Sequence, residues 1–179
     1  KNHSSPNWLA RHERPTCMDI NLKSLVSKLN DTSRRALESA AGLCLSRSNY
    51  DVEIEHWMLK ILELNDTDIS RLLRYYEIDG ANVIRDLTRA IDRFKTGNTR
   101  PPSLSPKIVD LIQASWLVGS IEFNSPVVRT GHLLMALLTD ESLVRLTRDA
   151  MPDLAKISAA DLKKEMRDIT SGSEEDVAL

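Results

Sequence analysis

Apolar residues recur at helical spacing along most of the chain, from about residue 20 onward. The first run lies at positions i, i+3, i+4 and i+7, which is one stripe of a short helix, and it comprises Leu22, Leu25, Val26 and Leu29. Residues 30–32, Asn-Asp-Thr, then offer capping side chains for a second helix. We therefore expect a leading helix over residues 20–29 and a capped helix directly after it.

The later patterns also indicate helices that are separated by polar turns. Residues 55–64 are apolar on nearly every side, which is typical of a buried helix, and the capping residues at 66–68 and at Asp79 indicate further helix starts. Residues 96–103 are rich in turn formers and predict a linker at mid-chain. After it, Ser105-Pro106 places an N-cap hydroxyl before a proline at the first helical position. Because strand-forming aromatic residues make up only 4% of the chain, we predict an all-α fold.

The pattern of the first half recurs in the second half. Leu37, Ala40 and Leu43 return with the same mutual spacing as Leu111, Ala114 and Leu117. The helix led by His56 returns, at nearly the same offset along the chain, as the helix led by His132. We interpret residues 18–168 as one pseudo-two-fold domain of two four-helix repeats, about 30–95 and 105–168, because neither repeat covers its apolar faces alone.

Charge and hydropathy exclude several classes of protein. The chain has 24 basic and 26 acidic residues, a net charge of −2, and so lacks the basic excess that nucleic-acid binding needs. No run of 18 apolar residues is present to span a membrane. The two cysteines do not have the paired spacing of a zinc site and fit a reducing compartment. We expect a cytoplasmic protein with neither a nucleic-acid nor a membrane partner.

The common catalytic motifs are missing from the sequence. GxxxxGK[ST], HExxH, GxSxG and GxGxxG do not occur, so we predict a non-catalytic domain with no cofactor or metal of its own. His56 and His132 hold matched positions and are the candidates for a metal site. Each begins a helix, however, where a ring nitrogen satisfies a local backbone or loop group, and we interpret both as structural. Cys44 lies on the packed face of its helix and is interpreted as a core residue, not a nucleophile.

The two ends of the chain do not fit the helical pattern. Residues 1–17 contain two prolines and no period, and the amphipathic pattern begins directly after Met18. We expect this prefix to be a tag remnant or a fused peptide, with a natural extension as the alternative. Residues 169–179 are polar and acidic and predict a linker.

The leading helix lies outside the repeat and still carries an apolar stripe. This stripe either covers the core of its own domain or forms one wall of a groove that takes a partner's amphipathic helix. The hydrophobic pattern alone leaves both interpretations open.

Two eight-residue motifs carry a resemblance to a known family. EHWMLKIL (55–62) and GHLLMALL (131–138) resemble the Clp N-terminal domain, which precedes the ATPase rings of Hsp100-type AAA+ unfoldases, and the likeness covers residues 19 to about 168. LVSKLN (25–30), ALESAAGLC (36–44) and GNTRPPSLSP (97–106), with a tryptophan in the next helix, are similar to the ClpV branch, the ATPase of type VI secretion. Trp57 departs from the aliphatic residue of most relatives.

The resemblance implies a recognition domain for a protein helix. It implies binding of an N-terminal helix of the contracted sheath's VipB/TssC-like subunit, so that the attached hexameric ATPase disassembles and recycles the sheath. It places the groove between the leading helix and the start of the second repeat, lined by Leu22, Leu25, Val26, Leu29, Leu104, Ser105 and Ile108. ATP would bind in rings beyond the linker at 169–179, and we expect the isolated domain to be monomeric. The alternative is the N-domain of a general Clp/Hsp100 disaggregase or protease partner that binds unfolded clients or an adaptor.

Overall fold

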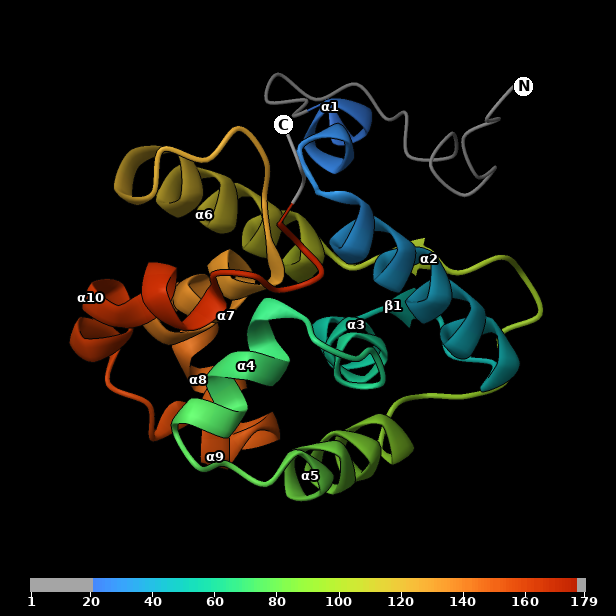
Figure 1. The fold of residues 1–179 in the computed structure, drawn as a ribbon. Coiled ribbons are helices and arrows are strands. Elements are labelled where there is room, and N and C mark those ends of the chain that lie inside the picture. The colour runs from blue at the N-terminus through green and yellow to red at the C-terminus, as the bar shows by residue number, and fades with distance from the viewer. Residues whose placement is uncertain (1–20, 177–179) are drawn as a thin grey trace.

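The computed structural model describes residues 21–176, so the prefix predicted at residues 1–17 lies outside the described residues. Helices dominate the described part of the chain, and the two strands in it are two residues long each (Figure 1). In chain order the elements are α1 (Leu22–Ser27), α2 (Asp31–Ser46), β1 (Asp51–Val52), α3 (Ile54–Leu62), α4 (Asp68–Tyr75), α5 (Gly80–Asp92), β2 (Ser103–Leu104), α6 (Pro106–Glu122), α7 (Thr130–Thr139), α8 (Glu141–Ala150), α9 (Pro152–Ala155) and α10 (Ala159–Thr170).

Helices begin at the capping residues that the sequence predicts. The Asn30 side chain accepts a hydrogen bond from the Ser33 amide, and the Thr67 hydroxyl accepts one from the Ser70 amide. Ser105 caps α6 directly before Pro106, which stands at the first helical position. Each cap satisfies a backbone N–H that has no partner within its own helix, which fixes where the helix starts.

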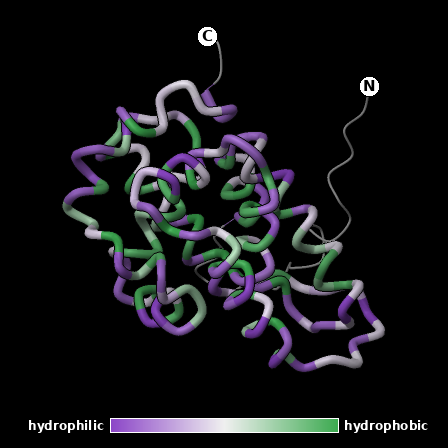
Figure 2. The backbone as a smooth tube through the Cα atoms, turned by 60° about the horizontal axis from the view of Figure 1, so that its bottom comes forward, coloured by the Kyte–Doolittle hydropathy of each residue, from purple (hydrophilic) through white to green (hydrophobic). Residues whose placement is uncertain are grey.

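α3 lies in the centre of the first repeat and packs against α2, α4 and α5 (Figure 1). Its side chains are buried on nearly every side, as the pattern at residues 55–64 predicts. Trp57 is fully buried, and its indole N–H donates to the carbonyl of Ser33 at 3.0 Å, so the bulky ring is both covered and satisfied. Along the outer helices, hydrophobic and hydrophilic positions alternate as amphipathic helices require (Figure 2).

Short extended segments of the two repeats pair with each other. β1, which precedes α3, pairs in parallel with β2, which precedes α6, in the register Val52 to Leu104. Leu29, which precedes α2, makes the matching parallel bridge to Val128, which precedes α7. The offset between the repeats relates Leu29 to Leu104 and Val52 to Val128, so the two pairs are equivalent. We call β1 with β2 the first joint and Leu29 with Val128 the second joint; they confirm the predicted pseudo-two-fold domain.

The end of the described chain differs from the solvated linker that we expected from residue 169. Ser173 and Glu175 are buried, with 4% of each residue exposed. Arg71 donates to the carbonyls of Ser171 and Gly172 at 2.6 and 2.8 Å, so this stretch is held against the domain. The polar side chains of residues 171–176 therefore serve internal hydrogen bonds, and this stretch packs as part of the domain.

Within residues 21–176, no helix combines the length and the apolar character needed to cross a membrane.

Candidate functional site

The leading helix of the sequence analysis is α1, a six-residue helix that packs against α6. Asn21 caps its start by accepting from the Ser24 amide, and Lys28 ends it. The Lys28 ammonium lies 4.8 Å from the centre of the Trp116 ring, a cation–π contact that fixes the end of α1 over the middle of α6. The second joint follows directly, so α1 is anchored at its C-terminal end.

The structure divides the α1 stripe into a covered and an accessible half. Val26 and Leu29 are each 5% exposed and belong to the core, whereas Leu22 and Leu25 are half-buried and retain accessible surface. α1 therefore covers the core of its own domain with one half of its stripe. The other half keeps accessible surface, and its role as the wall of a groove stays a prediction.

The structure buries the residues of the predicted second wall. Leu104, Ser105 and Ile108 are at most 4% exposed. Leu104 pairs with Val52, and the Ser105 amide donates to the carbonyl of Val52 at 3.0 Å. Leu104 and Ser105 thus hold β2 to the first repeat, and the side chains of all three residues are buried in this chain. The periodic pattern marked them as apolar or capping but did not show that the chain itself buries them.

Further along α6, the structure exposes apolar residues that were not predicted to line the groove. Leu117 is 59% exposed and Ile121 is 69% exposed, one helical turn apart, and Trp116 beside them is half-buried. The available signal was the excess of apolar residues in α6, which exceeds what one buried stripe requires. We call Leu22, Leu25, Trp116, Leu117 and Ile121, which keep accessible surface on these two packed helices, the α1–α6 face.

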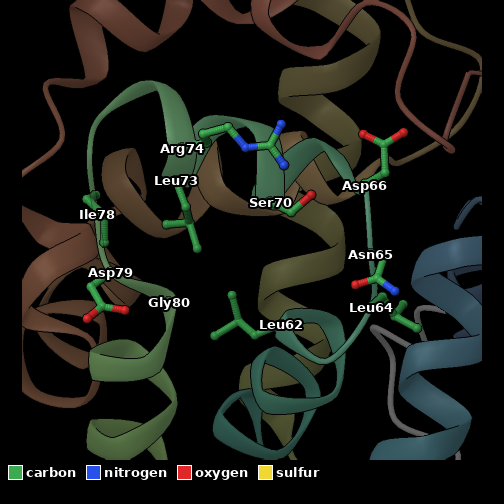
Figure 3. Close-up of a pocket in the computed structure, with 10 residues that line it drawn as sticks. All are labelled: Leu62, Leu64, Asn65, Asp66, Ser70, Leu73, Arg74, Ile78, Asp79 and Gly80. Carbon is green, nitrogen blue, oxygen red and sulfur yellow. The ribbon is translucent and has the colours of Figure 1, made fainter.

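Another part of the described chain forms a hollow on the surface. One hollow of about 730 Å³ is formed by the turns before α4 and α5, with Leu62, Leu73 and Ile78 at its base and Asp66 and Arg74 at its rim (Figure 3). Asp66 is engaged by the Arg71 guanidinium at 2.6 Å. None of the seven groove residues that the resemblance implied lines this hollow.

Both matched histidines satisfy backbone groups, as the sequence analysis proposed. The Nδ1 atom of His56 accepts the Glu53 amide at 2.9 Å, and Nδ1 of His132 accepts the Arg129 amide at 3.1 Å, so each closes a capping box. Burial lowers the pKa of each histidine to about 4, which keeps both rings neutral near pH 7. Within residues 21–176, no cluster of three or more His, Cys, Asp or Glu side chains is arranged to hold a metal ion.

Cys44 is a core residue, as predicted. Its side chain is fully buried, and its thiol donates to the carbonyl of Asp51 at 3.2 Å. Burial, with the nearby Asp51 and Glu53 carboxylates, raises the pKa of Cys44 to about 12. A thiol that stays protonated is a poor nucleophile.

Comparison with known proteins identifies the family. The family of the Clp repeat (R) N-terminal domain matches residues 28–150. The AAA+ ATPase ClpV1 of Pseudomonas aeruginosa is 32% identical over 157 residues, which are 88% of this chain and 17% of that protein. The chaperone protein ClpB of Yersinia enterocolitica is 33% identical over 158 residues, 88% of this chain and 18% of that protein.

A solved complex supplies the structural comparison. It is a ClpV N-domain with a VipB peptide, 28% identical, with a TM-score of 0.73 over 92% of this chain and 99% of that chain. Our chain thus spans less than a fifth of the length of either relative and nearly the whole of the solved N-domain. The chain belongs to the Clp repeat (R) N-terminal domain family.

Proposed function

We propose that this domain is the substrate-recognition domain of a ClpV-like ATPase and binds an N-terminal helix of a type VI sheath subunit. The observation that carries the proposal is the fold shared with a ClpV N-domain that was solved with a VipB peptide. Disassembly and recycling of the sheath would be the work of ATPase rings outside this chain, which would be hexameric and would hold the ATP. The domain itself is non-catalytic, cytoplasmic and, in isolation, monomeric in this proposal.

The α1–α6 face supports helix binding on physical grounds. It offers leucine and isoleucine side chains with accessible surface on two helices that are already packed together. Burial of one such side chain against an incoming amphipathic helix supplies about 2 kcal/mol. Because the caps and joints fix both helices beforehand, little conformational entropy is lost at the surface when the partner binds.

The test is the binding of a peptide with the sequence of the sheath subunit's N-terminal helix to the full chain. Leu25→Asp places a carboxylate on the accessible half of α1 and is expected to weaken binding more than tenfold. The matched control is Leu45→Asp, an exposed leucine at the far end of α2, which should leave the dissociation constant unchanged. Fluorescence anisotropy gives the affinity, and circular dichroism verifies the helical content of both variants.

Leu104 is unsuitable as a probe of the surface. It is 4% exposed inside the first joint, so Leu104→Asp is expected to unfold the domain whether or not a groove is present. If Leu25→Asp binds the peptide as the wild type does, the α1–α6 face is not the recognition site.

The general disaggregase is the second candidate, and the identity to ClpB over 88% of the chain favours it. A disaggregase N-domain would bind a denatured model protein in preference to the helical sheath peptide. A competition experiment with both ligands on the full chain separates the two functions. Displacement of labelled sheath peptide by unlabelled sheath peptide, but not by denatured protein, supports the ClpV assignment.

A further inference from the structure

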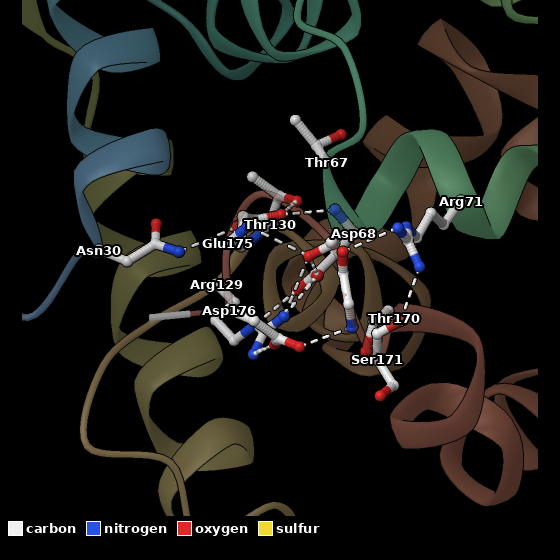
Figure 4. Close-up of polar contacts among 12 residues, drawn as sticks. Asn30, Thr67, Asp68, Arg71, Arg129, Thr130, Thr170, Ser171, Glu175 and Asp176 are labelled. Carbon is white, nitrogen blue, oxygen red and sulfur yellow. Dashed lines mark hydrogen bonds and ion pairs between the residues drawn. The ribbon is translucent and has the colours of Figure 1, made fainter. Parts of the chain in front are cut away.

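The carboxylate of Glu175 lies where the starts of three helices meet. Oε1 accepts hydrogen bonds from the Asn30 side-chain amide at 3.0 Å and from the Thr130 backbone amide at 2.7 Å. Oε2 accepts from the Asp68 backbone amide at 2.6 Å and from the Thr130 hydroxyl (Figure 4). One side chain of the tail thus contacts the beginnings of α2, α4 and α7.

The rest of the tail is held at several further points. The Ser173 hydroxyl donates to Asp68 at 2.7 Å, and the Glu174 amide donates to the carbonyl of Asp66 at 2.9 Å. Arg129 pairs with the buried Asp68 at 2.7 Å and with Asp176 at 2.6 Å. We call residues 171–176 the clamp. Because its contacts come from both repeats, its docking depends on how the repeats meet at the second joint.

Asn30 connects the clamp to the base of α1. Its side-chain oxygen caps α2, its side-chain NH2 group donates to Glu175, and its backbone amide donates to the carbonyl of Val128 at 2.9 Å. The preceding residue, Leu29, makes the bridge of the second joint, and α1 ends just before it at Ser27. A change in the position of Asn30 therefore acts on the end of α1 and on the clamp together.

We propose that the clamp couples the peptide-binding helix α1 to the chain beyond residue 176, so that docking of Glu175 favours peptide binding and peptide binding favours docking. The inference rests on the proposed function, since it takes the α1–α6 face as the peptide site. Linkage requires that the two effects have the same size, because each ligand of a two-state system changes the affinity of the other by one common factor. In a full-length unfoldase, the clamp would transmit occupancy of the N-domain to the segment leading to the rings.

Docking of Glu175 has contributions of opposite sign. Four hydrogen bonds favour the carboxylate, while burial and the nearby Asp68 carboxylate raise the pKa of Glu175. Release of the side chain to water would remove the cost of burying the carboxylate and so offset part of the four hydrogen bonds that are lost.

The experiment measures both ends of the coupling in the full chain. Glu175→Ala removes the acceptor, so hydrogen exchange at the Thr130 and Asp68 amides should accelerate and the affinity for the sheath peptide should fall about fivefold or more. The matched control is Glu174→Ala, an exposed neighbour whose side chain is outside the contact, with exchange and affinity both unchanged. Conversely, saturating peptide should slow exchange at the same two amides of the wild type by the same factor.

A second variant keeps the proposal testable if Glu175→Ala unfolds the domain. Asn30→Ser retains a good helix cap for α2 and removes only the NH2 donor to Glu175, so it should reproduce the loss of affinity. Faster exchange at Thr130 and Asp68 with an unchanged peptide affinity would overturn the coupling. A wild type that binds no sheath peptide would instead refute the proposed function, and its clamp amides would still show protection.

Discussion

The two joints have the same backbone pairing and differ in whether the buried carboxylates beside them have partners. At both joints a histidine closes a capping box at the start of the buried helix, His56 in α3 and His132 in α7. At the position before the histidine, the first joint has Glu55 and the second has Gly131. Symmetry is thus kept in the residue that caps the helix and lost in its neighbour.

The first joint buries a carboxylate with one unsatisfied oxygen. Glu55 is 8% exposed, and its Oε1 atom has no hydrogen-bond partner among the described residues. Burial, with the Glu53 carboxylate nearby, raises the pKa of Glu55 to about 7. The first joint therefore carries an energetic cost near neutral pH.

The second joint receives its carboxylates from elsewhere and pairs them. A Cβ atom at Gly131 would lie 2.7 Å from the Met166 sulfur and 3.2 Å from an Asp68 oxygen, so the glycine leaves room for both side chains. Asp68 pairs with Arg129, and Glu175 arrives from the clamp. The comparison shows that one position can specialise a duplicated frame: the joint whose carboxylates are satisfied is the one against which residues 171–176 pack.

The largest predicted effect breaks the pairing at the second joint. Asp68→Ala leaves Arg129, whose side chain is 21% exposed, without its buried partner, and should lower the free energy of unfolding by about 3 kcal/mol. Ser142→Ala is the matched control, because Ser142 lies in the first turn of α8, the counterpart of α4, and its hydroxyl bonds only to Asp140 in the same exposed turn. It should cost less than about 0.5 kcal/mol. Urea unfolding measures both, and equal losses would show that the second joint is not the more strongly coupled one.

The second prediction removes the unpaired charge of the first joint. Because the pKa of Glu55 is raised from 4.5 to about 7, its contribution to stability is present below pH 4.5 and lost as the pH rises through 7. Glu55→Gln should therefore stabilise the domain at pH 8, relative to its effect at pH 4.5, by about 3 kcal/mol. Urea unfolding at the two pH values gives the difference.

The control for this pH effect is Glu141→Gln, which removes one exposed charge from the first turn of α8. If both variants respond to pH alike, Glu55 has a partner in solution and the contrast between the joints disappears.

The sequence predicted the frame of the domain better than its contacts. Caps such as Asn30 and Ser105 and the roles of the two histidines depend on residues a few positions apart, so local patterns contain them. β1 and β2 pair through two residues each, and segments of that length are too short to show an alternating pattern in the sequence. Periodicity placed Ile108 on an apolar helix face, but it does not reveal whether the chain itself covers that face.

The clamp shows the same limit more strongly. An acidic tail is typical of a solvated linker, and only the tertiary structure brings the amides of Asp68 and Thr130 to Glu175. Residue 175 is 107 positions from Asp68 and 45 from Thr130, so no local pattern connects them. The accessible half of α1 was predictable as an apolar stripe, whereas its division into covered and open halves was not.

The smallest predicted effect compares glycines in the two matched helices α2 and α6. Gly42 in α2 has open space where a Cβ would lie, so Gly42→Ala should stabilise the domain by about 1 kcal/mol through helix propensity. At Gly119 in α6, a Cβ would lie 2.8 Å from Nδ1 of His132. That ring is stacked on Phe123 and accepts the Arg129 amide, so it has little freedom to move away. Gly119→Ala should therefore destabilise by about 1–2 kcal/mol.

Thermal unfolding of the two alanine variants beside the wild type distinguishes the helices by the sign of the shift. Opposite shifts in the midpoint temperature would show that α6 is held against the second joint by His132, while the end of α2 near Gly42 is free of such a contact. An equal stabilisation of both variants would mean that the His132 ring moves aside to accommodate the new methyl group at residue 119. In that case the capping box at α7 would be the adaptable part of the second joint, and the ion pair of Asp68 with Arg129 would be its rigid part.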